Sequence, residues 1–176
     1  MAEFEWGILS FPHKLEEYFD FDEGVIRERQ YKRRFFLFSA RDWTAIRKGL
    51  FKLFGSGAGL ILLDIARSVG CEFASEEKKA GMPLQKFLDG LATRTYYAGW
   101  GSTVMTENDD GSIHIKIKDC AFCNDAEVNP NAGGCFLLGV VQGMFDQLME
   151  SPHAVKEEKC KTRGDAICHI VIQRAV

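Results

Sequence analysis

The sequence predicts an α+β domain in which helices pack against an antiparallel sheet. Apolar residues recur at helical spacing through much of residues 43–95, and from residue 99 the period changes to that of strands. Ile113, Ile115 and Ile117 alternate strictly with polar residues, as in a strand that buries one face. With 176 residues, of which 46% are hydrophobic, the chain is long enough for one well-packed core and short for two.

We expect two parts in the chain. Residues 1–29 scatter aromatic residues among acids with no clean period, which indicates an N-terminal arm that packs on the body or on a second subunit. Residues 30–176 form the domain itself. Its first strand is predicted within residues 30–39, where Arg34 to Phe38 is a nearly continuous apolar run.

Three helices are predicted next. Ser39 and Asp42 have the spacing of a capping box, with Asp42 in place of the usual glutamate, and they begin the first helix. The second helix is expected over residues 58–69, with Gly70 as its end. Pro83 is suited to the first turn of the third helix, because its missing N–H would be unpaired there in any case.

The second half predicts two hairpins with a helix between them. The first hairpin covers residues 99–117 and the second covers residues 157–172, each with a glycine-containing turn. The helix between them is expected from Cys135 to Met149. Its Gly139 and Gly143 lie one turn apart, so that another backbone or a ligand can approach closely.

Charge and hydropathy restrict the class of protein. A formal net charge of -3 gives no electrostatic argument for nucleic-acid binding. Residues 1–19 carry charges where a secretory signal needs an apolar core, and the apolar run at residues 57–63 is too short to span a bilayer. We therefore expect a cytoplasmic protein without a membrane span. In a reducing compartment, six cysteines indicate metal or redox chemistry more often than disulfides.

Four residues near the C-terminus are candidate metal ligands: Cys135, Glu157, Cys160 and Cys168. Cys135 begins a helix, whereas the other three lie on the two arms of the last hairpin. Three thiolates and one carboxylate suit a tetrahedral zinc ion, and four protein ligands leave no position for an activated water. Such a zinc would be structural. The alternative is that these are buried, inert cysteines.

Cys120 and Cys123 form a C-x-x-C pair in the loop after the first hairpin. Three interpretations of this pair are open: incidental loop thiols, a redox pair, or metal ligands. The sequence has no second C-x-x-C, so this pair alone does not specify a zinc knuckle.

Several segments together resemble the 4-vinyl reductase domain, a family also described as hydrocarbon-binding and related in fold to the small subunits of TRAPP vesicle-tethering complexes. The segments that carry the resemblance are residues 57–70, 98–101, 115–122, 134–139 and 157–168. The resemblance implies a ligand-binding fold that often forms homodimers. It also implies a zinc ion on Cys135, Glu157, Cys160 and Cys168, as in sensor domains of this family that bind phenols.

An apolar ligand site is expected near the aromatic residues between the first hairpin and the last helix. The candidate ligand-binding residues are Tyr96, Tyr97, Trp100, Phe122, Phe136 and, as a polar contact, His114. The favoured function is a sensor or carrier domain that binds a hydrophobic or aromatic small molecule and contains structural zinc. A cysteine-based redox-sensing regulator and a scaffold subunit are the alternatives. An enzyme is disfavoured, because no nucleotide-binding motif follows a strand.

Overall fold

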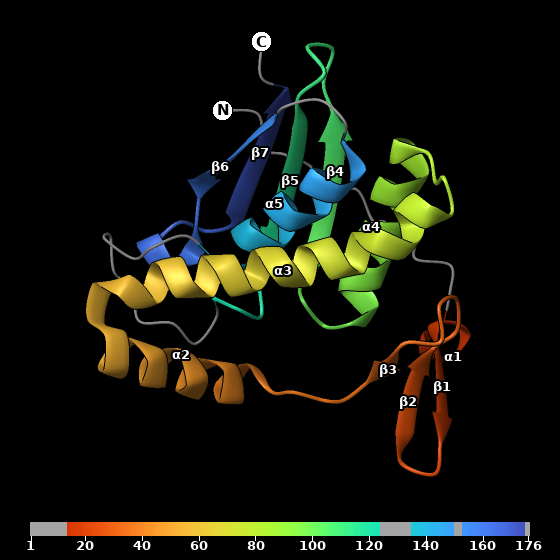
Figure 1. Cartoon of the computed structure of the whole chain (residues 1–176), viewed down its shortest axis with the longest axis horizontal. Coiled ribbons are helices and arrows are strands. Elements are labelled where there is room, and N and C mark those ends of the chain that lie inside the picture. The colour runs from red at the N-terminus through yellow and green to blue at the C-terminus, as the bar shows by residue number, and fades with distance from the viewer. Residues whose placement is uncertain (1–13, 124–134, 150–152, 175–176) are drawn as a thin grey trace. The chain divides into compact units, whose positions relative to one another are not determined.

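The computed structural model describes residues 14–123, 135–149 and 153–174 (Figure 1). Contacts within the chain divide it into two compact units, Met1–Leu37 and Phe38–Val176. The division falls after the predicted arm of residues 1–29, inside the segment where the first strand of the domain is expected. The role of the arm in a dimer stays a prediction.

The first unit contains a small antiparallel sheet in the order β1-β2-β3. Its elements are α1 (Leu15–Tyr18), β1 (Phe19–Asp22), β2 (Val25–Glu28) and β3 (Arg34–Phe35). The rings of Phe19 and Phe35 meet edge to face, with centroids 5.1 Å apart. The strand predicted through Phe38 is shorter than expected, and Phe36 and Leu37 are exposed.

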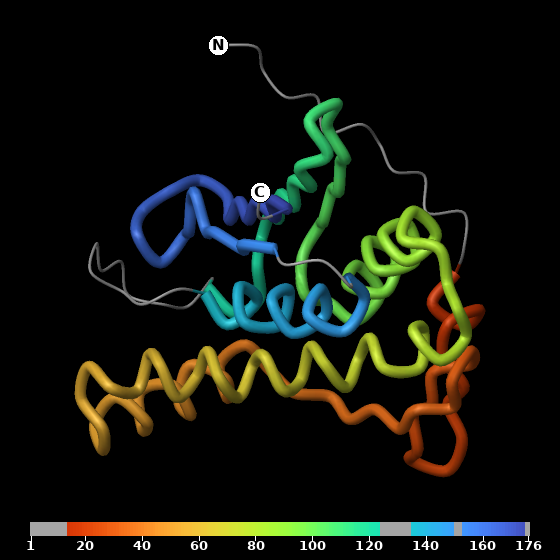
Figure 2. Tube along the Cα trace, turned by 45° about the horizontal axis from the view of Figure 1, so that its top comes forward, coloured from red at the N-terminus to blue at the C-terminus, as the bar shows by residue number. Residues whose placement is uncertain are grey.

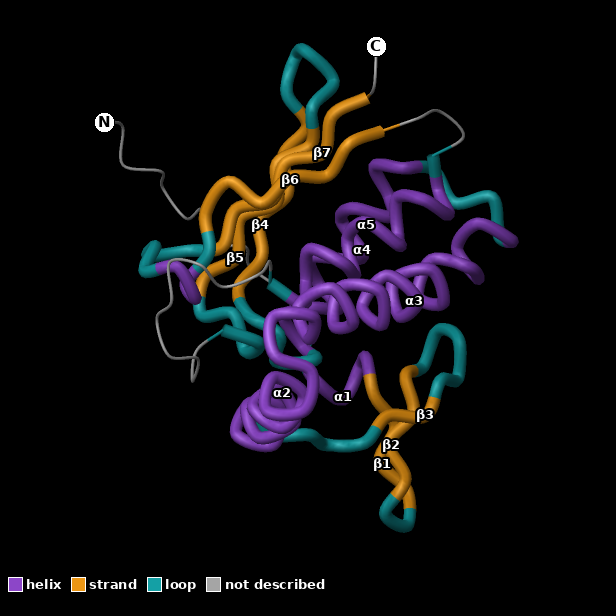
Figure 3. Tube along the Cα trace, turned by 60° about the vertical axis from the view of Figure 1, so that its left-hand side comes forward, coloured by secondary structure: helices purple, strands orange, loops and turns teal. Residues whose placement is uncertain are grey.

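The second unit has a four-stranded antiparallel sheet in the order β4-β5-β7-β6, with helices on one side of it (Figure 3). This arrangement confirms the predicted α+β fold. The elements are α2 (Ala40–Phe54), η1 (Gly55–Gly57), α3 (Ala58–Lys79), α4 (Leu84–Tyr97), β4 (Ser102–Glu107), β5 (Ile113–Lys118), α5 (Phe136–Leu148), β6 (His153–Lys159), η2 (Lys161–Arg163) and β7 (Cys168–Arg174). The predicted capping box at the start of α2 is present.

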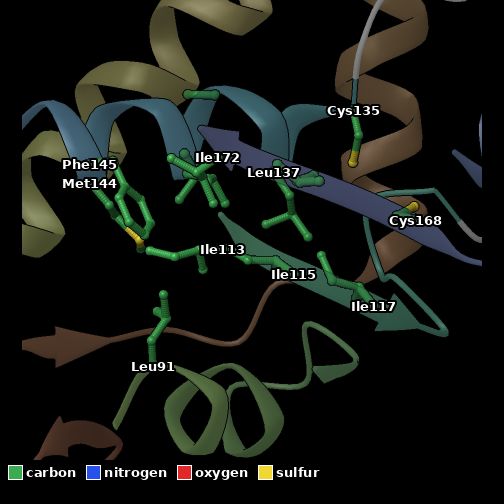
Figure 4. Packing of buried hydrophobic residues seen from close by; sticks show 14 of the residues in the cluster. Leu91, Ile113, Ile115, Ile117, Cys135, Leu137, Met144, Phe145, Cys168 and Ile172 are labelled. Atoms are coloured by element: carbon green, nitrogen blue, oxygen red, sulfur yellow. The ribbon is translucent and has the colours of Figure 1, made fainter. Parts of the chain in front are cut away.

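The core of this unit lies between the sheet and α5. Ile113, Ile115 and Ile117 turn the same face of β5 inward, as their alternation predicts, and each is at most 3% exposed. Figure 4 shows this isoleucine row beside Met144 and Phe145 of α5, which are also buried. Burial of such side chains stabilises the fold by roughly 1.5–3 kcal/mol each.

Helix α5 also runs alongside α3 (Figure 2), and glycines let the two backbones approach closely. A Cβ at Gly143 would lie 1.9 Å from the carbonyl oxygen of Arg67, and one at Gly70 would lie 2.0 Å from that of Val140. Gly70 therefore serves as a contact in the middle of α3. The prediction that the helix ends there is wrong: α3 continues to Lys79.

The segment Ala40–Lys79, which joins α2, η1 and α3, is long and apolar enough to cross a membrane by length and composition. Within its most apolar window, 17% of the residues are buried. Core helices of soluble proteins pass the same test. Among the residues described, this is the single stretch that passes it.

Gly143→Ala should destabilise the protein, because the added Cβ would meet the backbone of α3 rather than a movable side chain. We expect the free energy of unfolding to fall by about 1–3 kcal/mol, measured by thermal and urea denaturation. Gly49→Ala is the matched control. Gly49 lies within α2, and a Cβ added there would meet no atom within 4 Å, so alanine should raise stability by about 0.5–1 kcal/mol. An unchanged stability of the Gly143 variant would contradict the backbone contact.

Candidate functional site

Five buried cysteines from four parts of the second unit point their sulfur atoms at one another. Two follow β5, one precedes α5, one follows β6 and one begins β7: Cys120 and Cys123, Cys135, Cys160 and Cys168, respectively. Each is at most 3% exposed. Figure 4 shows Cys135 and Cys168 approaching each other at one end of the core. The sixth cysteine, Cys71, lies on α3 and belongs to neither candidate ligand group.

The spacing of the sulfur atoms fits a single tetrahedral ion. The Sγ atoms of Cys123 and Cys135 are 3.2 Å apart, and those of Cys123 and Cys168 are 3.8 Å apart. Three further Sγ pairs lie 3.9 Å apart: Cys120 with Cys135, Cys123 with Cys160, and Cys160 with Cys168. Zinc–sulfur bonds of about 2.3 Å give a tetrahedron with edges of about 3.8 Å. The donor set and its spacing therefore fit zinc.

Glu157 reaches the cluster because β6 is irregular. Glu157 and Cys160 are three residues apart, so a regular strand would turn them to opposite faces. The pairing with β7 shifts register between Glu157 and Lys159. The extra residue of this bulge directs both side chains to the core face.

The carboxylate of Glu157 is buried, with 2% of its side chain exposed, and has polar partners. Arg163 Nη1 donates to Oε2 at 2.9 Å, and the backbone N–H of Cys135 lies 3.3 Å from each carboxylate oxygen. Burial, followed by the negative charge of Cys160, raises the pKa of Glu157 to about 8 against the opposing effect of Arg163.

A tight turn presents Cys160 to the cluster. Its backbone N–H donates to Asp165 Oδ2 at 2.8 Å, and its Sγ lies 3.0 Å from Thr162 Oγ1. Gly164 adopts a left-handed conformation with φ of 98°, which glycine adopts without steric cost. The local sequence therefore fixes where this sulfur points.

The cysteines share protons when no ion is bound. The hydrogen bond with Cys123 lowers the pKa of Cys160 to about 6. The hydrogen bond with Cys120 raises the pKa of Cys123 above its ordinary value. Cys135 is the N-cap of α5, where the helix dipole favours a thiolate, although hydrogen bonds from Cys120 and its other neighbours raise its pKa. A metal ion would therefore have to displace protons on binding.

The predicted ligands lie in this cluster, and the structure adds two more cysteines to it. Cys135, Glu157 and Cys160 have ligand atoms within 4.8 Å of one another, and Cys135 forms a second such group with Cys120, Cys123 and Cys168. In the sequence, Cys120 and Cys123 stand as a separate pair. The pairing of Ile117 with Cys168 brings the end of β5 to the start of β7 and so joins this pair to the other cysteines, which cysteine spacing along the sequence does not indicate.

Three of the predicted ligand-binding residues belong to an aromatic cluster next to the sulfur atoms. The ring of Phe122 lies 5.4 Å from that of Trp100 and stacks on that of Phe136 at 5.0 Å. Sequence reasoning missed Trp43 of α2, whose ring lies 4.6 Å from that of Phe136 and whose Nε1 donates to the Phe122 carbonyl at 3.2 Å. It also missed Phe73 of α3, 5.5 Å from Trp100.

Two other predicted ligand-binding residues, Tyr96 and Tyr97, pack against each other with ring centroids 5.4 Å apart. His114 lies on the face of β5 opposite the buried isoleucines. Its Nδ1 is 3.0 Å from His169 Nε2, and desolvation together with the charge of His114 lowers the pKa of His169.

A separate pocket of about 290 Å³ lies over α3, α5 and β6. Its walls combine apolar side chains with a few polar ones: Leu60, Leu63, Asp64, Arg67, Leu138, Gly139, Gln142 and Val155. None of the predicted ligand-binding residues lines it. Arg67 is ion-paired with Asp146 at 2.5 Å.

Comparisons with known proteins show similarity in fold to a phenol-responsive sensory domain and to a trafficking protein particle complex subunit. A scan against known protein families finds no match. The uncharacterized protein MJ0745 of Methanocaldococcus jannaschii is 28% identical over 60 residues, which are 34% of this chain and 32% of that protein. The chain thus matches about a third of the length of this curated relative.

Solved structures extend the similarity to nearly the whole chain. The phenol-responsive sensory domain of the transcription activator PoxR, with phenol, has a TM-score of 0.69 at 18% identity over 91% of this chain and 86% of that one. The trafficking protein particle complex subunit 3 from Naegleria fowleri, covalently bound to palmitic acid, has a TM-score of 0.59 at 13% identity over 78% and 93%. A vinyl-4-reductase family protein from Methanocaldococcus jannaschii aligns at 0.49 and 15% identity over 78% and 91%. The first two confirm the predicted fold relationship to phenol sensors and TRAPP subunits.

Arg163→Met should destabilise the metal-free protein, because it leaves the buried Glu157 carboxylate without its cation. We expect a loss of about 1–3 kcal/mol in urea denaturation with a chelator present at pH 9, where Glu157, with its pKa of about 8, is ionised. Lys156→Met is the control, since Lys156 forms an exposed pair with Glu158 at 2.8 Å. Its effect should stay within about 0.5 kcal/mol. Equal effects of the two substitutions would show that Arg163 does not stabilise Glu157.

Proposed function

We propose that this chain is the small-molecule-binding domain of a sensor or carrier, organised around a structural zinc ion. The observation that supports this function is the position of the aromatic cluster, whose residues alternate in sequence with the cysteines. Phe122 lies between Cys120 and Cys123, and Phe136 follows Cys135. A metal on the sulfurs would therefore position the walls of an aromatic binding site.

The proposed zinc ion is held by cysteines that include the predicted Cys135, Cys160 and Cys168. It joins the start of α5 to the two strands of the last hairpin and leaves no open coordination position for catalysis. Four anionic ligands on a divalent cation leave a formal charge of about -2. With Glu157 as one of the four ligands, Arg163, which lies 2.9 Å from its carboxylate, offsets part of this charge.

The proposed ligand is a hydrophobic or aromatic molecule that binds against the pair Phe122 and Phe136. Trp43 covers this pair from α2, a helix that has no buried residue. Because few contacts hold α2, movement of Trp43 could open the site to a ligand of similar size. The likeness to a domain solved with phenol supports this choice, and the likeness to a subunit bound to palmitic acid makes a fatty acyl chain the second ligand class to test.

A homodimer is part of the proposal. Helices α2 and α3 expose several large apolar side chains: Ile46, Phe51, Leu53, Phe54, Leu60 and Ile65. Exposed apolar side chains in this number are typical of an interface with another chain. A cytoplasmic location stays a prediction.

Protein purified without added metal should carry one zinc ion per chain, measured by elemental analysis and native mass spectrometry, which also gives the oligomeric state. Cys160→Ser should release the ion. Zinc affinity, measured by chelator competition, should fall with decreasing pH, because Cys135 and Cys123 hold protons that the metal must displace, and it should fall more steeply below about 6, where Cys160, with its pKa of about 6, also becomes protonated. Stoichiometric zinc in the Cys160 variant would count against the site.

Ligand binding can be tested by calorimetry with a panel of substituted phenols and with palmitate. Phe122→Ala should weaken binding of the tightest ligand by about tenfold, since an aromatic contact contributes about 0.5–1.5 kcal/mol beyond its buried area. Leu138→Ala, in the pocket over α3 and α5, is the control and should leave affinity unchanged. The reverse result would move the ligand site to that pocket.

A redox sensor is the second candidate function, and the 3.2 Å between the sulfurs of Cys123 and Cys135 favours it. In this function, a peroxide would oxidise the two thiols to a disulfide, with two electrons and two protons reducing the peroxide to water. Mass spectrometry of peroxide-treated protein would detect the loss of two hydrogens. Reversal by a dithiol would then distinguish a sensor from damage.

A further inference from the structure

The sulfur atom of Cys123 has close sulfur neighbours on three sides. It lies 3.2 Å from the Sγ of Cys135, 3.8 Å from that of Cys168 and 3.9 Å from that of Cys160. Cys160 and Cys168 are themselves 3.9 Å apart. Cys123, Cys160 and Cys168 therefore form a nearly equilateral triangle, whose edges match the face of a zinc–sulfur tetrahedron at about 3.8 Å.

Cys135 supplies the fourth corner above this face. Its Sγ contacts that of Cys123 and lies within 4.8 Å of Cys168 in one candidate ligand group and of Cys160 in the other. These four sulfurs can therefore surround one ion with small adjustments of their side chains.

Glu157 is placed less well for coordination. Its carboxylate forms a candidate group with Cys135 and Cys160 but, among the described residues, not with Cys168. It also has two partners already: Arg163 at 2.9 Å and the backbone N–H of Cys135. These contacts assign Glu157 the role of holding the start of α5 and the last turn in place.

We propose that the metal site is all-thiolate, with Cys123 as the fourth ligand in place of Glu157; this inference rests on the zinc ion of the proposed function. The fifth sulfur, that of Cys120, lies 3.9 Å from Cys135 and stays outside the coordination sphere as a thiol. Coordination through Cys123 ties the loop that carries Phe122 to the metal. Metal occupancy then fixes Phe122 against Trp43, so the metal and the proposed ligand site share one segment of chain.

X-ray absorption at the zinc edge tests the ligand set on the unaltered protein. The all-thiolate site predicts four sulfur scatterers at about 2.3 Å, whereas a site with Glu157 predicts three sulfurs and one oxygen at about 2.0–2.2 Å. An oxygen in the first shell would overturn the inference while leaving the zinc-containing function intact. Protein that retains no metal would instead overturn both.

Cobalt-substituted variants provide a second test, because thiolate-to-cobalt charge-transfer absorption scales with the number of thiolates. With cobalt in excess, so that the weakened site stays occupied, Cys123→Ser should lower this absorption by about one quarter, the share of one thiolate in four. Glu157→Gln and Cys120→Ser are the matched controls and should leave it unchanged. A change in the Glu157 variant with none in the Cys123 variant would refute the assignment. The X-ray measurement decides the question if Cys123→Ser fails to fold.

Discussion

The pairing of β5 with β7 is the constraint on which the site depends. It sets Ile117 opposite Cys168 and so brings the loop after β5 to the start of β7. The isoleucine face of these strands packs against α5, whose N-terminus then lies over the same end of the sheet. A slip of β7 by one residue would turn Cys168, Ile170 and Ile172 to the face opposite the isoleucines of β5. The apolar core and the sulfur cluster are therefore specified by the same register.

Much of the fold could be predicted because local patterns and tertiary packing agree. The capping box at Ser39, the alternation around Ile115 and the glycine-containing turn before Cys168 each specify an element without long-range information. The prediction of a helix end at Gly70 is wrong for a physical reason. A glycine inside a helix and a glycine that ends one look alike in sequence, and the difference here is the carbonyl of Val140 on another helix.

The site was only partly predictable. The spacing of the cysteines along the last hairpin, with a glycine turn between them, indicates Cys160 and Cys168 as ligands. The position of Cys123 depends on the pairing of β5 with β7, which the spacing does not encode. Trp43 joins the aromatic cluster across 79 residues of sequence, so periodicity shows it only as part of an amphipathic helix. The alternation along β5 places His114 on the face opposite Ile113 and Ile115.

Cys71 provides an internal standard for thiol labelling, because its reaction can be compared with that of the five cysteines in the cluster. It is half-buried on α3, whereas the five sulfurs of the cluster are enclosed. In the folded chain a small alkylating agent can reach Cys71. Opening of the end of the core would expose the five cysteines of the cluster as well. The stepwise or simultaneous labelling of these positions would reveal whether the hairpin, the loop after β5 and the start of α5 separate one by one or as a unit.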